Sequence, residues 1–270
     1  MSYVNNDSVR IYYEVDGQGP PILLAHGATG DTTFWRGYGY VDQLRDQYTV
    51  ILFDARGHGR SDKPHQQEAY DYRLMVGDVL IILDTLGVKK THYWGYSLGG
   101  SNGLGLAQYH PERLHSMIVG GTDPMQSADR VGKPCPLLEV FQRGVAGGVD
   151  EVVEGMRTLA GSITPQYEQR LRKVDPKAMV ALLEEARRRP SFADILPQLE
   201  IPCLLYAGDG DEGPFENGPR AAQKMPRARF FSLSGLNHVG ASAAVELVLP
   251  EVRRFLSNVG GPVFKTQGRY

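Results

Sequence analysis

Gly95-Tyr96-Ser97-Leu98-Gly99-Gly100 is the stretch that decides the fold of this chain. An apolar run over 91–94 precedes it, and a helical pattern rich in small residues follows over 101–108. Gly-x-Ser-x-Gly between a strand and a helix is typical of a sharp turn that holds one serine hydroxyl in the open. A side chain at either flanking glycine would clash with the neighbouring strand or helix. A helix starting after Ser97 also directs free N–H groups and a partial positive charge at the turn.

The composition is that of an ordinary globular protein with nearly balanced charge. Of 270 residues, 41% are hydrophobic and 22% are charged, and 29 basic against 31 acidic side chains give a formal net charge of −2. This balance offers no electrostatic basis for binding nucleic acid or an anionic membrane surface. The first residues lack the pattern of a signal peptide, and no apolar run is long enough to cross a bilayer. Because Cys135 and Cys203 are far apart, we expect no disulfide framework, no metal site and a reducing, cytoplasmic location.

Apolar runs and helical patterns alternate through most of the chain. Strands are predicted over 9–14, 22–25, 49–53, 91–94, 117–119, 203–206 and 229–233. Helices are predicted over 34–46, 72–86, 101–109 and 241–256. Such alternation predicts an α/β fold, a mostly parallel twisted sheet flanked by helices. No helix separates the first two strands, so we expect them to form an antiparallel hairpin.

Residues 122–199 break this alternation because they contain helical patterns and no convincing strand. The predicted helices span 137–144, 149–159, 164–174 and 177–189, and Pro190 ends the last of them. An all-helical insertion of this size between the strands over 117–119 and 203–206 indicates a lid over the carboxyl edge of the sheet. The alternative is a set of peripheral helices packed away from the site. We therefore expect a core domain over 1–121 and 200–259, a helical lid over 122–199 and a flexible tail over 260–270.

Four sequence blocks resemble those of the α/β-hydrolase fold family, and they occur in the order found in that family. They are Leu23-Leu24-Ala25-His26-Gly27, the loop Asp54-Ala55-Arg56-Gly57-His58-Gly59-Arg60-Ser61, the nucleophile elbow around Ser97, and the pair Gly208-Asp209-Gly210-Asp211 and Gly235-Leu236-Asn237-His238. The resemblance covers nearly the whole chain outside the lid. It implies a serine esterase or lactonase-like member, in which serine, carboxylate and histidine follow one another in the chain.

The histidine expected to act as general base is His238. A serine hydroxyl is a poor nucleophile at neutral pH and needs a base within hydrogen-bond reach. His238 follows an apolar strand by a short loop containing glycine, which places its imidazole at the carboxyl edge of the sheet. It would take the proton during attack and return it to the leaving group. His26 and His58 lie in turn motifs, where we expect them to orient loops by hydrogen bonds.

The sequence offers three carboxylates as partner for that histidine. Resemblance to the family's Gly-x-x-Asp pattern favours Asp211 over Asp209. Some relatives place the acid after the preceding strand, which here would be Asp123, but a turn or a helix cap is the favoured role for that residue. The cluster Asp209-Gly210-Asp211-Glu212 fails the spacing of a calcium loop, so we expect no metal there.

Two backbone N–H groups are expected to form an oxyanion hole. The residue after the nucleophile is Leu98, and the resemblance implies Ala28 in the turn after the third strand as the second donor. No phosphate-binding loop and no dinucleotide fingerprint is present, so no cofactor is expected.

Together these features predict a serine hydrolase that cleaves a small-molecule carboxylic ester or lactone through an acyl-enzyme. A carbon–carbon bond hydrolase and a cofactor-free perhydrolase remain open on the same three residues. Val239 follows His238, whereas carbon–carbon hydrolases often carry tryptophan there, and this difference lowers that alternative. A non-catalytic ligand receptor on the same fold is a further alternative. The sequence does not give the oligomeric state.

Overall fold

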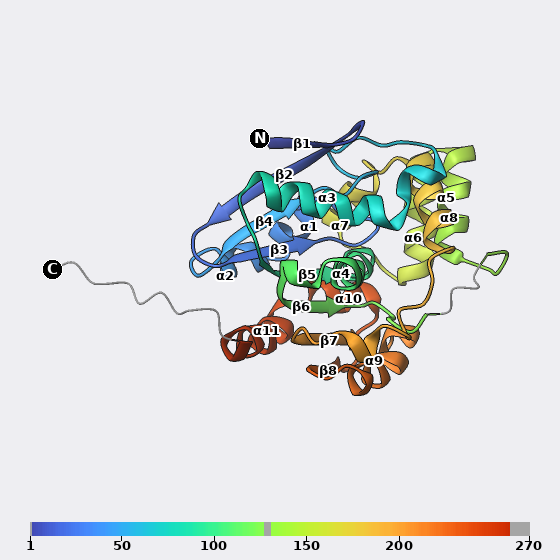
Figure 1. Ribbon diagram of the computed structural model, residues 1–270. Coiled ribbons are helices and arrows are strands. Elements are labelled where there is room, and N and C mark those ends of the chain that lie inside the picture. Colours follow the sequence, from blue (N-terminus) through green and yellow to red (C-terminus); the bar gives the residue numbers. More distant parts are fainter. Residues whose placement is uncertain (1, 127–130, 260–270) are drawn as a thin grey trace.

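Eight strands form one sheet in the described part of the chain. The computed structural model describes residues 2–126 and 131–259. The strands lie in the order β1-β2-β4-β3-β5-β6-β7-β8, and Figure 1 shows them with their covering helices. Their bounds are β1 Ser2–Asn6, β2 Val9–Gly17, β3 Pro21–Ala25, β4 Thr49–Phe53, β5 Thr91–Tyr96, β6 Leu114–Gly120, β7 Cys203–Gly208 and β8 Ala228–Leu233. The pairs β1–β2 and β2–β4 are antiparallel and the other five are parallel, which confirms the predicted fold class.

The predicted hairpin between the first two apolar strands is wrong. The segment predicted over 9–14 is part of β2, and it pairs with β1 and β4 rather than with β3. β3 instead lies between β4 and β5, parallel to both. The antiparallel start is the β1–β2 hairpin, whose first strand, Ser2-Tyr3-Val4-Asn5-Asn6, buries only Val4. An edge strand with one buried side chain carries little apolar signal, so it was not predicted.

Helices cover both faces of the sheet, because each strand sends alternate side chains to opposite faces. One face packs α3 (Tyr72–Thr85), α4 (Leu98–Tyr109) and α9 (Glu212–Lys224) against residues such as Leu23, Tyr93 and Leu205. The other face packs α1 (Thr32–Gly37), α2 (Tyr40–Leu44), α10 (His238–Ala243) and α11 (Val245–Val259) against Leu24, Trp94 and their neighbours. Short 3-10 turns lie at η1 Gln67–Tyr70, η2 Pro111–Arg113 and η3 Leu196–Gln198.

Two helices differ from their prediction for identifiable reasons. The single helix predicted over 34–46 is divided into α1 and α2 by Gly39, whose φ of 84° is left-handed and interrupts the helix. Helix α9 was not predicted. It holds two prolines and two glycines, and its buried residues are the small Gly218 and Ala221, so its sequence has a low helix propensity.

The segment between β6 and β7 is helical, as predicted. It contains α5 Pro136–Gly147, α6 Val149–Ala160, α7 Pro165–Leu171 and α8 Pro176–Ala186. Figure 1 shows α5, α6 and α8 grouped at one end of the sheet, and α5 contacts both of the others. Their buried side chains form a third apolar cluster that includes Tyr70, Met75 and Leu98 of the core. The division into a core domain over 1–121 and 200–259 and a lid over 122–199 stays a prediction, and the tail predicted over 260–270 lies outside the described residues.

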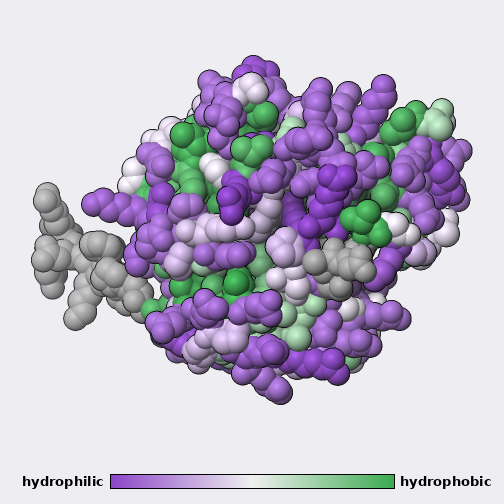
Figure 2. Space-filling view, turned by 45° about the vertical axis from the view of Figure 1, so that its right-hand side comes forward, coloured by the Kyte–Doolittle hydropathy of each residue, from purple (hydrophilic) through white to green (hydrophobic). Residues whose placement is uncertain are grey.

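The described helices are all too short or too polar to traverse a bilayer. Figure 2 shows a mostly hydrophilic face on which apolar residues form small separate groups. The cytoplasmic location stays a prediction.

A buried ion pair joins the loop after β4 to helix α3. The Arg56 guanidinium donates to both oxygens of Asp78 at 2.7 and 2.6 Å, and each side chain is 2% exposed. Asn6 of β1 donates to the same carboxylate at 2.8 Å. The pair therefore ties the edge hairpin, the loop and the helix together.

We expect Asp78→Asn to lower the free energy of unfolding by about 3–5 kcal/mol, because the substitution leaves a buried guanidinium without its counter-charge. Asp42→Asn is the control, since its exposed pair with Arg45 within one helical region is worth no more than about 1 kcal/mol. Urea unfolding followed by fluorescence measures both. Equal losses in the two variants would contradict the role given to the buried pair.

Candidate active site

The backbone at Ser97 is strained. Its φ of 53° and ψ of −112° lie outside the regions that residues with a side chain normally adopt. Two hydrogen bonds hold it there: the Ser97 N–H donates to Gly120 O at 2.8 Å, and the Thr122 hydroxyl donates to Ser97 O at 2.8 Å. Ser97 lies between the end of β5 and the start of α4, and it is half-buried. Strain of this kind gathers at functional sites, where the surrounding structure over-determines it.

The glycines beside Ser97 are required by close backbone contacts. A Cβ on Gly95 would lie 2.2 Å from Gly99 O, and a Cβ on Gly99 would lie 2.2 Å from Ala25 O. Gly99 O belongs to helix α4 and Ala25 O to the central strand β3, so neither can move without shifting a packed element. The Gly-x-Ser-x-Gly pattern is therefore a packing requirement of this turn.

His238 and Asp211 are brought together from loops that follow neighbouring strands. The His238 Nδ1 lies 2.6 Å from Asp211 Oδ2, with Asp211 13% exposed and His238 42% exposed. With Nδ1–H donating to the carboxylate, Nε2 is the nitrogen left to face the pocket. His238 begins α10, and its carbonyl accepts from the Tyr96 hydroxyl at 2.5 Å, which anchors that loop beside the serine turn.

The other two candidate acids have different partners. Asp209 accepts from the Gly235 N–H at 2.8 Å and from the Ser234 hydroxyl at 3.1 Å, so it shapes the loop after β8. Asp123 accepts from the Met125 N–H at 2.9 Å, as expected of a turn residue, and from the Asn217 side chain. Of the three carboxylates, Asp211 is the one placed to orient His238.

Two pockets meet at Ser97. The apolar pocket, about 300 Å³, is lined by Phe34, Tyr38, Tyr96, Met156, Leu159, Tyr167 and Arg170 among others. The polar pocket, about 340 Å³, is lined by Ser101, Thr122, Asp123, Arg189 and Asp211 among others. Ala28, Ser97 and His238 line both pockets. A bound molecule can therefore extend to either side of the serine.

Two buried histidines fix the turn that holds Ala28. His26 Nε2 accepts from the Ala55 N–H at 3.1 Å, so its Nδ1–H donates to Gly27 O at 2.8 Å. His58 Nε2 lies 2.7 Å from Ala28 O and its Nδ1 lies 3.0 Å from Arg56 O, so a neutral ring donates its one N–H to one of these two carbonyls. Burial lowers the pKa of His26, and burial together with His26 lowers the pKa of His58 to about 4. Both rings are therefore neutral at pH 7 and orient the turn, as predicted from their motifs.

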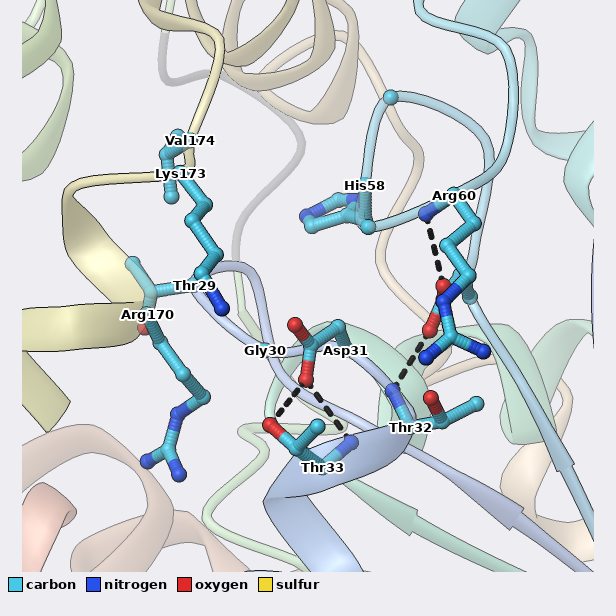
Figure 3. A pocket seen from close by; sticks show the side chains of 13 residues that line it. Thr29, Gly30, Asp31, Thr32, Thr33, His58, Arg60, Arg170, Lys173 and Val174 are labelled. Atoms are coloured by element: carbon cyan, nitrogen blue, oxygen red, sulfur yellow. Dashed lines mark hydrogen bonds between the residues drawn. The ribbon is translucent and has the colours of Figure 1, made fainter. Parts of the chain in front are cut away.

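A third hollow borders the same turn, and Figure 3 shows its side chains. The Asp31 carboxylate caps α1 by accepting from the Thr33 N–H at 2.8 Å. Asp54 accepts from the N–H groups of Thr32 and Arg60 at 2.6 and 2.8 Å. Because loop N–H groups already engage these carboxylates, we assign this hollow no chemistry.

Arg170 and Tyr167 of α7 are pocket residues that the sequence did not reveal. They line the apolar pocket, although no residue of the helical segment was predicted to face substrate. Helix α7 and its flanks contain two arginines, Arg170 and Arg172, and nothing in the sequence distinguishes the one that turns inward.

Comparison with known proteins identifies the class. A family model described as the alpha/beta hydrolase fold matches residues 20–160, and the chain belongs to this family.

Individual relatives agree with that membership. The chain is similar to the fluoroacetate dehalogenase of a Burkholderia species, with 26% identity over 98% of this chain and 96% of that protein. It is also similar to YraK, an uncharacterised hydrolase of Bacillus subtilis, with 36% identity over 43% of this chain and 44% of that protein. Several curated relatives match over less than half of their own length. The solved enol-lactonase of Burkholderia xenovorans has the same fold, with a TM-score of 0.79, 24% identity and coverage of 95% of this chain and all of that one.

The low pKa of His58 predicts how stability depends on pH. In the unfolded chain His58 takes up a proton near pH 6.5, whereas in the folded protein it does so only near pH 4. Stability therefore falls as the pH drops through this interval, by up to about 1.4 kcal/mol per pH unit for one such group. In His58→Gln, which keeps a donor for Ala28 O but does not titrate, we expect a shallower fall. Urea unfolding at pH 7, 6 and 5 measures both slopes, and equal slopes would contradict the prediction.

Proposed function

We propose that this protein is a serine hydrolase that cleaves a carboxylic ester or lactone of a small molecule through an acyl-enzyme. Ser97 is the nucleophile, His238 the general base and Asp211 the residue that orients the imidazole. The observation that carries the proposal is the 2.6 Å contact between His238 and Asp211 at a rim shared with a strained, half-buried serine. A nucleophile, a base and an orienting acid delivered in this chain order form a competent hydrolytic set.

In the proposed reaction, Ser97 Oγ attacks the carbonyl carbon while its proton passes to His238 Nε2. The carbonyl oxygen becomes an oxyanion that accepts from the N–H groups of Ala28 and Leu98. Leu98 supports this role as the first residue of α4, and Ala28 supports it through the neutral histidines that hold its turn. The imidazolium then protonates the leaving oxygen, and the C–O bond breaks to give the acyl-enzyme. A water molecule, deprotonated by His238, releases the acid and restores the Ser97 hydroxyl.

The two pockets that meet at Ser97 favour a substrate with two arms. Attack at an ester carbonyl needs room for the acyl part on one side and for the alcohol part on the other. The apolar and polar pockets supply this room, since Ala28, Ser97 and His238 line both.

The identity of the nucleophile separates this proposal from other chemistries on the fold. Dehalogenation and epoxide opening, which are named for two relatives, need a carboxylate where this chain has Ser97. Carbon–carbon bond hydrolysis and perhydrolysis use the same serine, so a vinylogous diketone and hydrogen peroxide belong in the substrate panel. A ligand receptor would show a single slow turnover with the product retained.

We expect Ser97→Ala to abolish turnover of short p-nitrophenyl esters, with kcat reduced by about six orders of magnitude, as for other triads. The reason is that the variant lacks the hydroxyl that forms the acyl bond in the proposed reaction. A fluorophosphonate probe should label the wild type and not the variant, and circular dichroism should show that the variant is folded. A variant that keeps a tenth of the wild-type rate would refute the proposal.

We expect Asp211→Asn to lower kcat by up to about 10⁴-fold, because an amide at this position cannot stabilise the imidazolium and favours the wrong tautomer. Asp209→Asn is the matched control, and its hydrogen bonds to Gly235 and Ser234 predict a loss below about tenfold. Steady-state kinetics on one neutral ester compare the two. A larger loss of kcat in the Asp209 variant would mean that Asp209, and not Asp211, orients His238.

A further inference from the structure

Arg170 is a buried guanidinium without a carboxylate partner among the described residues. It lies on α7 and is 6% exposed. One nitrogen, Nη2, donates to the Tyr38 hydroxyl at 3.1 Å, while Nε and Nη1 have no hydrogen-bond partner in the described part of the chain. Burial of a charge is unfavourable unless hydrogen bonds and a counter-charge compensate it. Asp78 supplies Arg56 with hydrogen bonds and a counter-charge. Arg170 has one hydrogen bond and no counter-charge among the described residues.

Aromatic rings supply part of the compensation. The Arg170 Cζ lies 5.2 Å from the ring centre of Tyr38, 5.5 Å from that of Tyr167 and 5.7 Å from that of Phe34. Ring faces attract a cation, but they do not replace oxygen acceptors for its N–H groups. The guanidinium is therefore held in place with part of its hydrogen-bonding capacity unused.

This guanidinium belongs to the wall of the apolar pocket. Among the described residues that line the pocket, Arg170 is the one that carries a permanent charge, and no acidic residue lines it. Asp31 lines the neighbouring hollow together with Arg170, but its carboxylate is bonded to Thr33, and no dashed line reaches Arg170 in Figure 3. Tyr167, whose ring packs on Arg170, is hydrogen-bonded to Thr29 at 2.9 Å, next to Ala28. The cation thus lies close to the turn proposed to bind the oxyanion.

We propose that Arg170 binds a carboxylate of the substrate, so that the enzyme acts on anionic esters or lactones with an apolar body and a carboxylate remote from the scissile bond. This proposal rests on the proposed hydrolase function. A planar guanidinium matches two carboxylate oxygens, which would give its N–H groups the acceptors they lack. The polar pocket is the less suitable place for the anion, because two carboxylates, Asp123 and Asp211, line it against one guanidinium, Arg189.

The test compares esters that differ only in a distant carboxylate. One pair is mono-p-nitrophenyl adipate and p-nitrophenyl hexanoate, with the charge on the acyl side. The other pair is 4-acetoxybenzoate and phenyl acetate, with the charge on the alcohol side. In the wild type we expect kcat/KM to favour the anionic ester in one pair. In Arg170→Met the anionic-to-neutral ratio in that pair should fall at least tenfold, mainly through KM, and Arg170→Lys should restore part of it.

Lys173→Met is the matched control. Lys173 lies three residues further along the chain and lines the neighbouring hollow, but it does not line the apolar pocket. Its removal takes away a nearby positive charge, so it measures the general effect of charge on anionic esters. We expect it to leave the ratio within twofold of the wild type.

Ratios in Arg170→Met that stay within twofold of the wild type in both pairs would overturn the proposal, because a general loss of activity cancels in the ratio. If Arg170→Met does not fold, inhibition of the wild-type enzyme tests the proposal instead. Adipate should inhibit hydrolysis of phenyl acetate at least tenfold more strongly than adipamide. Equal inhibition by the two compounds would overturn the proposal. Hydrolysis that depends on Ser97 but not on Arg170 would refute this inference alone. Hydrolysis that persists in Ser97→Ala would refute the proposed function itself.

Discussion

The packing of the turn between β5 and α4 is the constraint on which the rest of the site depends. β5 is a central strand, paired with β3 on one side and β6 on the other, so its end cannot shift. Gly95 and Gly99 let strand and helix backbones approach closely, and this approach forces Ser97 into its left-handed conformation. The strain costs about 1–3 kcal/mol, which the central strands and their hydrogen bonds offset. The parallel strands β3, β7 and β8 end at the same edge of the sheet as β5. The loops that follow them therefore lie around this fixed turn.

Charge is distributed unevenly around that edge. The two histidines that hold the Ala28 turn are neutral at pH 7 because burial lowers their pKa values, so in the proposed reaction peptide N–H groups and not ions would face the oxyanion. The Asp211 carboxylate is mostly shielded and lies against His238. Among the residues that the structure describes, Arg170 is the one permanent cation in the wall of the apolar pocket, and its Nε and Nη1 have no hydrogen-bond partner there.

The sequence predicts the parts of this structure that local pattern determines. The buried parallel strands appear as apolar runs, and the order of Ser97, Asp211 and His238 follows from motifs at strand ends. β1 and α9 were missed because β1 buries only Val4, and because α9 contains two prolines and two glycines and therefore has a low helix propensity. Asp209 and Asp211 are two residues apart, and only the path of the β8 loop determines which of them reaches His238. Arg170 was not predictable, because its significance depends on Tyr38, Tyr167 and the absence of a carboxylate neighbour among the described residues, and none of these is local in sequence.

The core and the helical segment contribute different properties to the site. The core sheet supplies the serine turn, the candidate base and its acid, all from loops at strand ends. The helical segment supplies much of the wall of the apolar pocket, including Arg170 and Tyr167. The hydrogen bond from Tyr167 to Thr29 joins the two parts beside Ala28, but one such bond contributes only about 1 kcal/mol. The apolar cluster that α5, α6, α7 and α8 share with Tyr70, Met75 and Leu98 must therefore hold the segment in place. Leu98 belongs both to this cluster and to the proposed oxyanion hole, so movement of the helices would disturb the proposed catalytic geometry as well as the pocket wall.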